Sequence, residues 1–234
     1  MGPRRASSAT NCSARQSRAE SSVPSAPPFS ALFLLLEPAV GRAFRGVVDD
    51  LDTDTVEADD FDRLAKAVTD DDPLIVRHVG GSEPRDFIWT DEGVTCISDR
   101  VVRTLRVNAV TGWETFAVRV STKAGRTLHG YAGLDVTGAC GPLDFTASER
   151  IEKITPAGRE QAFLGRYFDR RTWDGTMIFR PQGSADIVVT ERVRDVFRRA
   201  KVENIEMKSL DDIEVPGDEV ALWRAGVDGP SVLG

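Results

Sequence analysis

The chain has 234 residues, of which 41% are hydrophobic and 29% are charged, and its formal net charge is −7. A chain of this length can bury a full core without disulfides or metal ions. Its longest apolar run, at residues 31–36, is far shorter than the ~18 residues of a membrane span. These values exclude collagen, coiled coils, membrane-spanning helices and disulfide scaffolds, and they favour a globular protein that contains both helices and strands.

The N-terminal third of the chain begins with a polar tail. Residues 1–29 are rich in Ser, Ala, Pro and Arg and have no hydrophobic periodicity, so we expect them to be disordered. The apolar run 30–37 predicts the first strand, and residues 58–68 have the apolar spacing of a helix. The β-branched stretch 74–79 ends at two glycines and predicts a further strand.

The middle of the chain has the clearest local signals. Residues 87–89 and 94–97 flank a polar turn that contains glycine, and they predict a hairpin. A helix is expected over residues 99–106, because Ser98 is a favoured N-cap and an acidic residue follows it. The hairpin should therefore lead directly into a short amphipathic helix.

Two alternating stretches, 114–121 and 127–136, are joined by a glycine-containing turn and predict an antiparallel pair. Three later strands are expected, over residues 176–180, 186–189 and 204–207. The pattern as a whole predicts a mostly antiparallel sheet.

Helices in the second half are expected over residues 160–168 and 191–200, the latter with Thr190 as its N-cap. From residue 211 to the end at 234 the sequence predicts a loop-like extension. We therefore expect one α+β domain over residues 30–210, with a mostly antiparallel sheet and a few short capped helices.

The negative charge is concentrated in one segment. Residues 47–72 contain eleven acidic and two basic residues, a net charge of −9, so the remainder carries +2. Asp50, Asp52 and Asp54 match the start of an EF-hand loop, but Thr55 and Phe61 replace its glycine and its final glutamate. The segment is therefore either a solvated acidic loop or a surface for a basic partner. The acidic residues that we expect to face a partner are Asp49, Asp50, Asp52, Asp54, Glu57, Asp59 and Asp60.

Candidate nucleophiles and metal ligands are few: Cys12, Cys96, Cys140, His78 and His129. No two of them have the short spacing of zinc ligands, and the chain has neither a Gly-x-Ser-x-Gly motif nor a glycine-rich phosphate loop. We therefore predict no catalytic residue, no metal and no cofactor. The odd number of cysteines fits a reducing compartment, and a Cys96–Cys140 bridge stays open. The alternative is a small hydrolase-like enzyme that uses His129 or Cys140.

Several short segments, taken in order, resemble a bacterial protein family. They are Asp86-Phe87, Ile97-Ser98-Asp99-Arg100, Gly112-Trp113-Glu114-Thr115-Phe116-Ala117-Val118, Tyr131-x-Gly133-Leu134-x-Val136, Gly141-x-Leu143-Asp144, Phe168-Asp169, Trp173-Asp174-Gly175 with Ile178-Phe179, and Val189-Thr190-Glu191. The chain resembles immunity protein family eleven of polymorphic toxin systems, which is common in myxobacteria and other proteobacteria. The resemblance covers residues 85–210, with weaker support from residue 30.

The resemblance implies an α+β fold and a non-catalytic protein that binds and neutralises a toxin encoded nearby. We expect this protein to be cytoplasmic. The resemblance supplies no catalytic residues. Its aromatic motif residues are either core residues or partner contacts: Trp113, Phe116, Trp173 and Phe179. Trp113 and Trp173 are the candidate partner contacts beside the acidic segment. The expected partner is the cognate protein toxin, and neither nucleic acid nor membrane is expected to bind. A structural or scaffolding interaction domain is a third interpretation that the sequence does not separate from the first.

Overall fold

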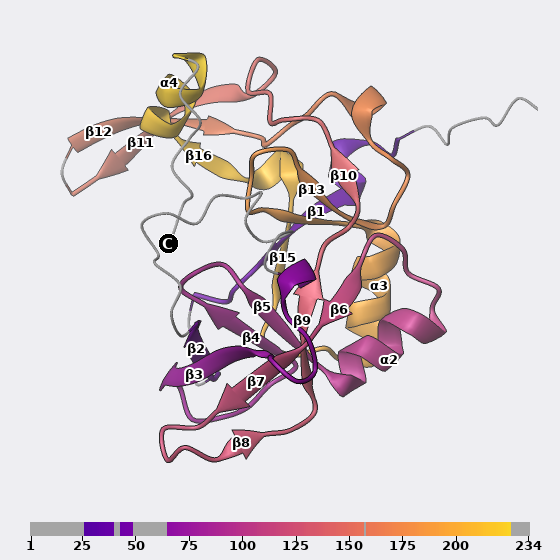
Figure 1. Cartoon of the computed structure of the whole chain (residues 1–234). Helices are drawn as coiled ribbons and strands as arrows, with labels where there is room; N and C mark the ends of the chain where they lie inside the picture. Colours follow the sequence, from indigo (N-terminus) through magenta and orange to yellow (C-terminus); the bar gives the residue numbers. More distant parts are fainter. Residues whose placement is uncertain (1–25, 40–42, 49–64, 157, 226–234) are drawn as a thin grey trace, which may run out of the picture.

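The computed structural model describes residues 26–39, 43–48, 65–156 and 158–225, which form three sheets and several short helices (Figure 1). Most of the tail expected at 1–29 lies outside these residues. Of the helix expected at 58–68, residues 65–67 are helical, Val68 is described but is not helical, and residues 58–64 lie outside the described part of the chain.

A five-stranded sheet lies at the centre of the molecule. Its order is β10 (Ala139–Cys140), β13 (Ile178–Pro181), β14 (Ile187–Thr190), β1 (Leu32–Leu36) and β15 (Glu206–Ser209). Phe33 and Leu35 of β1 join one hydrophobic cluster, whereas Leu32 and Leu34 join another. Both faces of this sheet are therefore buried, which is why β1 is a continuous apolar run rather than an alternating one.

An eight-stranded sheet closes on itself. Its order is β6 (Glu114–Phe116), β9 (Tyr131–Asp135), β5 (Thr95–Ser98), β4 (Phe87–Thr90), β2 (Arg45–Val48), β3 (Leu74–Gly80), β7 (Val118–Ser121) and β8 (Thr127–Leu128). β6 pairs with β9 at one end of this order, and β7 pairs with β3 near the other. Only Ala117 separates β6 from β7, so one chain segment joins the two ends. We call this closed sheet the roll.

The core of the roll is one hydrophobic cluster in which Val76, Ile88, Cys96 and Val120 are fully buried. The antiparallel pairing expected between residues 114–121 and 127–136 is confirmed, but each stretch is divided into two strands. Because of this division, β6 pairs with β9 at one end of the strand order, and β7 pairs with β3 and β8 near the other end. The expected single alternating strand at 114–121 is therefore wrong in its continuity.

Two helices lie side by side between the roll and the central sheet, α2 (Asp99–Val107) and α3 (Glu191–Ala200). The Ser98 hydroxyl accepts a hydrogen bond from the Val101 backbone N–H at 3.3 Å, so the predicted cap of α2 is confirmed. Thr190 occupies the N-cap position of α3, but its hydroxyl makes no capping bond and is buried without a hydrogen-bond partner among the described residues. The position of that cap was predicted correctly and its chemistry was not.

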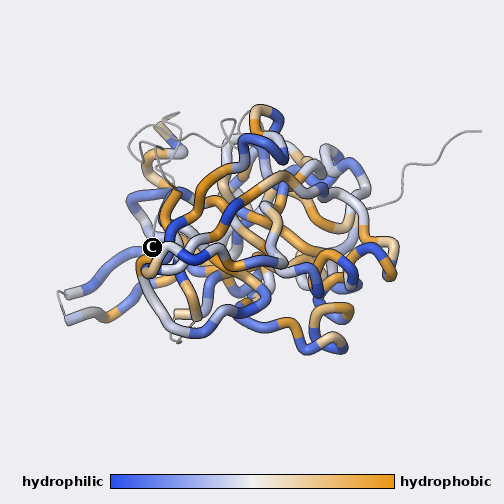
Figure 2. Tube along the Cα trace, turned by 60° about the horizontal axis from the view of Figure 1, so that its bottom comes forward, coloured by the Kyte–Doolittle hydropathy of each residue, from blue (hydrophilic) through white to orange (hydrophobic). Residues whose placement is uncertain are grey.

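A three-stranded sheet forms a projecting arm. It consists of β11 (Glu149–Thr155), β12 (Gly158–Leu164) and β16 (Glu214–Pro216), and α4 (Gly217–Arg224) packs beside β12. The helix expected at 160–168 is therefore wrong, and the loop-like extension expected from 211 is ordered structure through residue 224. Both errors arise because the arm is mainly hydrophilic and lacks the alternation that marks a half-buried strand (Figure 2). The remaining helical turns are η1 (Phe29–Ala31), η3 (Arg170–Thr172) and η4 (Leu210–Asp212).

Several other sequence predictions can be compared directly with the strands. The predictions at 74–79, 87–97, 176–180 and 186–189 are confirmed within a few residues, and the last predicted strand begins two residues late, at Glu206. Parallel pairing occurs between β2 and β4, between β3 and β7, and between β10 and β13. The expectation of mixed helix and strand content is thus confirmed, while the sheets are mixed rather than purely antiparallel. No helix in the described part of the chain is both long and apolar enough to cross a membrane.

Candidate functional site

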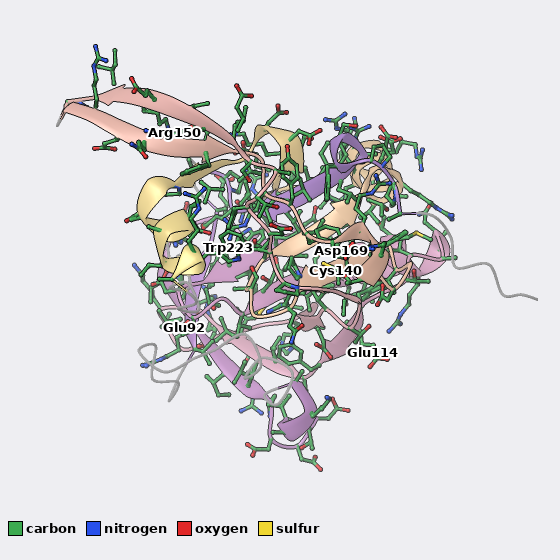
Figure 3. All side chains as sticks on the ribbon, turned by 90° about the horizontal axis from the view of Figure 1, so that it is seen from above. Glu92, Glu114, Cys140, Arg150, Asp169 and Trp223 are labelled. Atoms are coloured by element: carbon green, nitrogen blue, oxygen red, sulfur yellow. The ribbon has the colours of Figure 1, made fainter. Side chains whose placement is uncertain are left out.

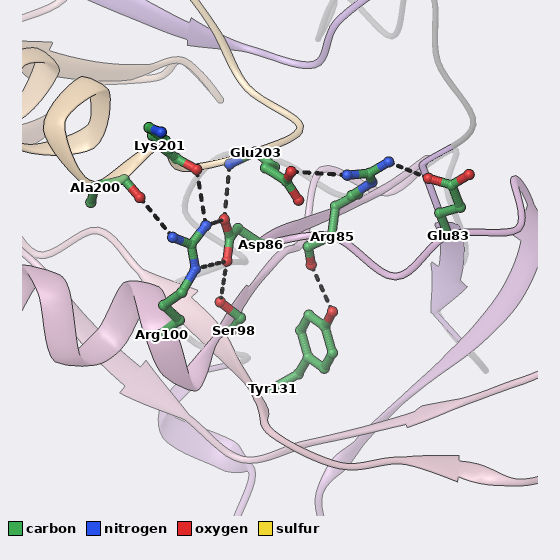
Figure 4. Close-up of polar contacts among 9 residues, drawn as sticks. All are labelled: Glu83, Arg85, Asp86, Ser98, Arg100, Tyr131, Ala200, Lys201 and Glu203. Carbon is green, nitrogen blue, oxygen red and sulfur yellow. Dashed lines mark hydrogen bonds and ion pairs between the residues drawn. The ribbon is translucent and has the colours of Figure 1, made fainter.

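An open depression of about 510 Å³ lies where β4, β5, α2, β9 and the end of α3 meet (Figure 4). It gathers Pro84 and several polar residues that come from distant parts of the sequence: Arg85, Asp86, Ser98, Arg100, Tyr131, Lys201 and Glu203. Four of these residues, Asp86, Ser98, Arg100 and Tyr131, belong to the segments on which the family resemblance depends. The chemistry of the depression depends on how these groups are paired.

Asp86 is the central acceptor, and only 6% of it is exposed. It accepts hydrogen bonds from the Ser98 hydroxyl at 2.8 Å and from the Glu203 backbone N–H at 2.9 Å. The Arg100 guanidinium donates hydrogen bonds to both carboxylate oxygens, from Nε to Oδ1 at 3.0 Å and from Nη2 to Oδ2. Four donors therefore converge on one carboxylate, and we call this cluster the Asp86 junction.

Arg100 also reaches the carboxyl end of α3. Its Nη1 donates to the Ala200 carbonyl at 2.6 Å, and its Nη2 donates to the Lys201 carbonyl at 3.0 Å. Carbonyls at the end of a helix lack partners within the helix and attract positive charge. Lys201 ends α3 in the left-handed conformation, with φ of 50°. The junction thus joins the start of α2 to the end of α3.

The protonation of the junction suits a structural role. Burial tends to raise the pKa of the Asp86 carboxyl, but hydrogen bonds from Arg100, Glu203 and Ser98 outweigh it and hold that pKa below its usual value. Burial, and next the negative charge of Asp86, raise the pKa of Tyr131 to about 12. A catalytic base needs an accessible lone pair and a pKa near the working pH. Asp86 is instead ionised and fully paired, and the Tyr131 phenol stays protonated.

The rim of the depression is held by further pairs. The Tyr131 hydroxyl donates to the Arg85 carbonyl at 2.6 Å. The Arg85 guanidinium forms ion pairs with Glu203, at 2.9 Å, and with Glu83. Every charged group drawn in Figure 4 except the Lys201 ammonium therefore has a protein partner. The polar groups of the depression thus connect neighbouring strands and helices to one another.

A second group of motif residues holds loops together. Asp174 accepts from the Thr176 backbone N–H at 2.9 Å and from the Ala139 backbone N–H at 2.8 Å. A side chain at Gly112, whose φ is 88°, would overlap the Ile178 carbonyl oxygen. The Gly112 and Trp173-Asp174-Gly175 segments therefore fix the path of the chain into β13.

The two tryptophans that the sequence proposed as partner contacts lie in different environments. Trp173 is 9% exposed, packs against Phe179 in a hydrophobic cluster, and donates its indole N–H to the Thr176 carbonyl at 3.0 Å. Trp113 is only half-buried, and its indole N–H donates to the Val110 carbonyl at 2.9 Å. Only Trp113 therefore presents ring surface to the solvent to any extent.

Trp113 lines an open depression of about 410 Å³ beyond the end of α2. We call its lining the Trp113 face, which consists of Arg106, Val110, Trp113, Glu114 and Thr115. Val107, the neighbour of Arg106 and the last residue of α2, is 79% exposed, which is unusual for a large apolar side chain. The face therefore combines an aromatic ring with apolar and charged neighbours.

Of the candidate nucleophiles and metal ligands, Cys12 lies outside the described residues, and the structure does not gather the other four into one site. Cys96 and Cys140 are both free and buried, and burial raises the pKa of each thiol to about 12, with Asp174 adding to the effect at Cys140. The His78 ring stacks on Phe44 with centroids 3.8 Å apart, while its Nε2 lies 2.6 Å from the Gly80 carbonyl. His129 is exposed between β8 and β9. In the described part of the chain, no three His, Cys, Asp or Glu side chains form a metal-binding group.

The acidic residues predicted to face a partner, Asp49 to Asp60, lie outside the described residues. No protein-family model matches the chain, and no similar protein is found among curated proteins.

The Asp86 junction was not predicted as a cluster, although three of its residues stood in the motif segments. Its other half comes from backbone groups at the end of α3, for which residue type gives no signal.

Proposed function

We propose that this chain is a non-catalytic immunity protein that binds and neutralises a protein toxin encoded nearby. The proposal rests on the ordered motif segments, which resemble immunity protein family eleven. The observation that carries it is the position of Trp113, a partly buried motif residue that packs against a hydrophobic cluster and also lines an open depression. Most of the other motif residues make contacts inside the protein, so their role is explained by the fold, whereas the exposed part of this ring is not.

The Trp113 face has the properties of a binding hot spot. Tryptophan is enriched among the residues that contribute most to protein interfaces. The bond from its indole N–H to Val110 holds the ring in place, so little side-chain freedom is lost on binding. Arg106 and Glu114 supply charges of both signs around the ring, as is usual at the polar rim of an interface.

The acidic segment 47–72 adds a second element to the proposal. The segment has a net charge of −9, whereas the rest of the chain has a net charge of +2. The segment is therefore the main source of the protein's negative electrostatic field. A concentrated charge of one sign accelerates association with an oppositely charged partner, and the effect weakens as salt screens it. We therefore expect a toxin with a basic binding surface.

Co-expression tests the function directly. The large open reading frame beside this gene is induced with and without the chain, and the two products are tested for co-purification. Relief of growth arrest together with a stable complex supports immunity. A harmless neighbour, or arrest that this chain does not relieve, contradicts it.

The Trp113 face is tested by Trp113→Ala, with Trp223→Ala as the matched control. Trp223 is also half-buried and also donates its indole N–H to a carbonyl, that of Leu143, but it lies on α4. We expect Trp113→Ala to weaken the complex by about 30-fold, as for a hot-spot residue worth ~2 kcal/mol. Equal losses in the two variants would exclude this face as the interface.

The acidic segment is tested by reversing the charges of its aspartates. We expect slower association and a weaker dependence of the association rate on salt, with a smaller effect on dissociation. Unchanged association kinetics would remove the segment from the proposal and leave the Trp113 face on its own.

A further inference from the structure

The arm formed by β11 and β12 extends away from the rest of the molecule (Figures 1 and 3). Within the described residues, β11 pairs with β12 on one side and with no strand on the other. β16 pairs with β12 only at the base of the arm, through residues 162–164. Among the described residues, the outer edge of β11 is therefore an unpaired row of backbone donors and acceptors, which is a template for another strand.

The hairpin turn determines which residues of β11 face outward. Two residues separate Thr155 from Gly158, the last pair of the ladder, so this pair must exchange backbone hydrogen bonds directly. Backbone groups then alternate along β11, and those of Arg150, Glu152 and Ile154 point away from β12. A strand that adds to this edge must form its hydrogen bonds with these three residues.

An added copy of β11 has few registers available. A twofold axis makes the two strands antiparallel, and the outward backbone groups can meet only if the axis passes through a residue of the strand. Axes through the charged residues would place each of these side chains opposite its own copy: Glu149, Arg150, Glu152 and Lys153. An axis through Ile154 runs into the turn and leaves few pairs. Only an axis through Ile151 avoids both problems.

In the Ile151 register every charge meets its opposite. Arg150 lies opposite Glu152 of the second copy, and Glu149 lies opposite Lys153 of the second copy, and symmetry repeats each pair. Directly opposed side chains of unlike charge stabilise an antiparallel pair, and like charges destabilise it. The two Ile151 side chains meet at the axis in a pair without hydrogen bonds between its residues, where side chains approach most closely.

The ion pairs that these charged residues form within one chain do not prevent them from pairing with a second copy. Lys153 forms an ion pair with Glu214, and Glu152 lies 3.5 Å from Arg159. All four side chains are exposed, and exposed ion pairs contribute little. Ile154 at the tip is 87% exposed. We propose that the outer edge of β11 pairs with the same edge of a second copy of this chain, in the register centred on Ile151.

Charge reversal tests the proposal by sedimentation velocity of the full chain over a range of concentrations. We expect a reversible dimer for the wild type, and about a tenfold weaker dimer for Arg150→Glu, because two attractive pairs become repulsive. The double variant Arg150→Glu with Glu152→Arg restores the unlike pairs and should return the dissociation constant to within about threefold. Thermal unfolding of each variant shows whether the fold is retained.

A cysteine placed on the axis tests the register. In a Cys12→Ser background, Ile151→Cys should form a disulfide-linked dimer on mild oxidation, because Cα atoms about 4.5 Å apart suit a disulfide. Gln161→Cys, exposed on the other strand of the arm, is the matched control and should remain monomeric on denaturing gels. Cys96 and Cys140 are buried, so we expect neither thiol to react in the folded chain.

Several results would overturn the proposal: a wild-type chain that is monomeric at about 0.1 mM, a dimer that Arg150→Glu does not weaken, a double variant that does not recover, or equal cross-linking of the two cysteine variants. If the edge instead takes a toxin strand, Arg150→Glu will weaken toxin binding while the free chain is monomeric. The samples contain no toxin, so the result is independent of the proposed immunity function.

Discussion

The hairpin at residues 114–135 and the arm at residues 149–164 are both antiparallel pairs. The hairpin packs against the core of the roll, whereas the arm extends away from the rest of the molecule. In the first, Phe116, Val118 and Val120 repeat on one face and join the core of the roll. In the second, charged residues occupy both faces of β11, so neither face is withdrawn from water. The arm is held at its base, where Phe163 pairs across from Val215 and both are buried.

The difference shows that hairpin formation and burial are separate properties of a sequence. Backbone pairing and a tight turn suffice to define a hairpin. Only a periodic apolar face makes the pair part of a core. The two hairpins should therefore respond very differently to the same kind of substitution, and three comparisons can test this.

The largest effect is expected from Gly133→Val in the first hairpin. Gly133 lies directly across from Phe116, and a side chain there would overlap the Phe116 ring. Displacing that ring should cost about 3 kcal/mol of the free energy of unfolding. Gln161→Val, at an exposed position of the arm, should change it by less than about 0.5 kcal/mol. Urea unfolding of both variants measures the contrast, and similar values for the two would contradict it.

A second comparison concerns pH. The first hairpin is tied through Tyr131 to Arg85, the neighbour of the buried Asp86, whereas the arm is tied through the exposed pair of Lys153 and Glu214. The pKa of Asp86 is below its usual 3.8, so its contribution is complete above that value and is lost as pH falls through the lower folded-state pKa.

We expect Asp86→Asn to lower the free energy of unfolding by about 2 kcal/mol at neutral pH, because Arg100 loses its charged partner. The variant should also lose part of the decline in stability that the wild type shows below about pH 4. Glu214→Gln serves as the control and should leave the pH profile nearly unchanged, because its ion pair is solvated. An unaltered acid limb in Asp86→Asn would exclude Asp86 as its source.

The smallest effect is expected at the tip of the arm. Ile154→Thr keeps a β-branched side chain at a position that is 87% exposed, and it should change stability by less than about 0.5 kcal/mol. Val120→Thr makes the equivalent change at a position that is 1% exposed, and it should cost about 2 kcal/mol because a hydroxyl is buried. Thermal unfolding of the two variants measures the difference in stability. Because Ile154 is exposed and Val120 is buried, this difference should be large.

The parts of the fold that could be predicted are those whose signals are local. The hairpin of β4 and β5 and helix α2 follow from a turn, a cap at Ser98 and an apolar stripe, all within a dozen residues. The break at Ala117 has no such signal, because the residues on both sides alternate alike. The stretch 114–121 is divided because its first half, β6, pairs with β9, whereas its second half, β7, pairs with β3, a strand distant in sequence from β9.

The candidate site shows the same limit. Trp113 and Trp173 both lie near a glycine in a turn, and the sequence offered no reason to separate them. Trp173 is buried because Phe179 packs against it, a contact that depends on the path of β13. Asp86 could be recognised as a motif residue, but its partners include backbone groups near residue 200, which composition does not reveal.

The separate placement of the two buried thiols gives the protein internal reporters. Cys96 lies in the core of the roll, and Cys140 lies in the cluster on the far face of the central sheet. Since the thiolate is the reactive form, a thiol reagent can modify either residue only after its surroundings open. With Cys12 replaced by serine, the two labelling rates would report how often each core opens. Equal rates would mean that the molecule opens as one cooperative unit, and unequal rates would show which core gives way first.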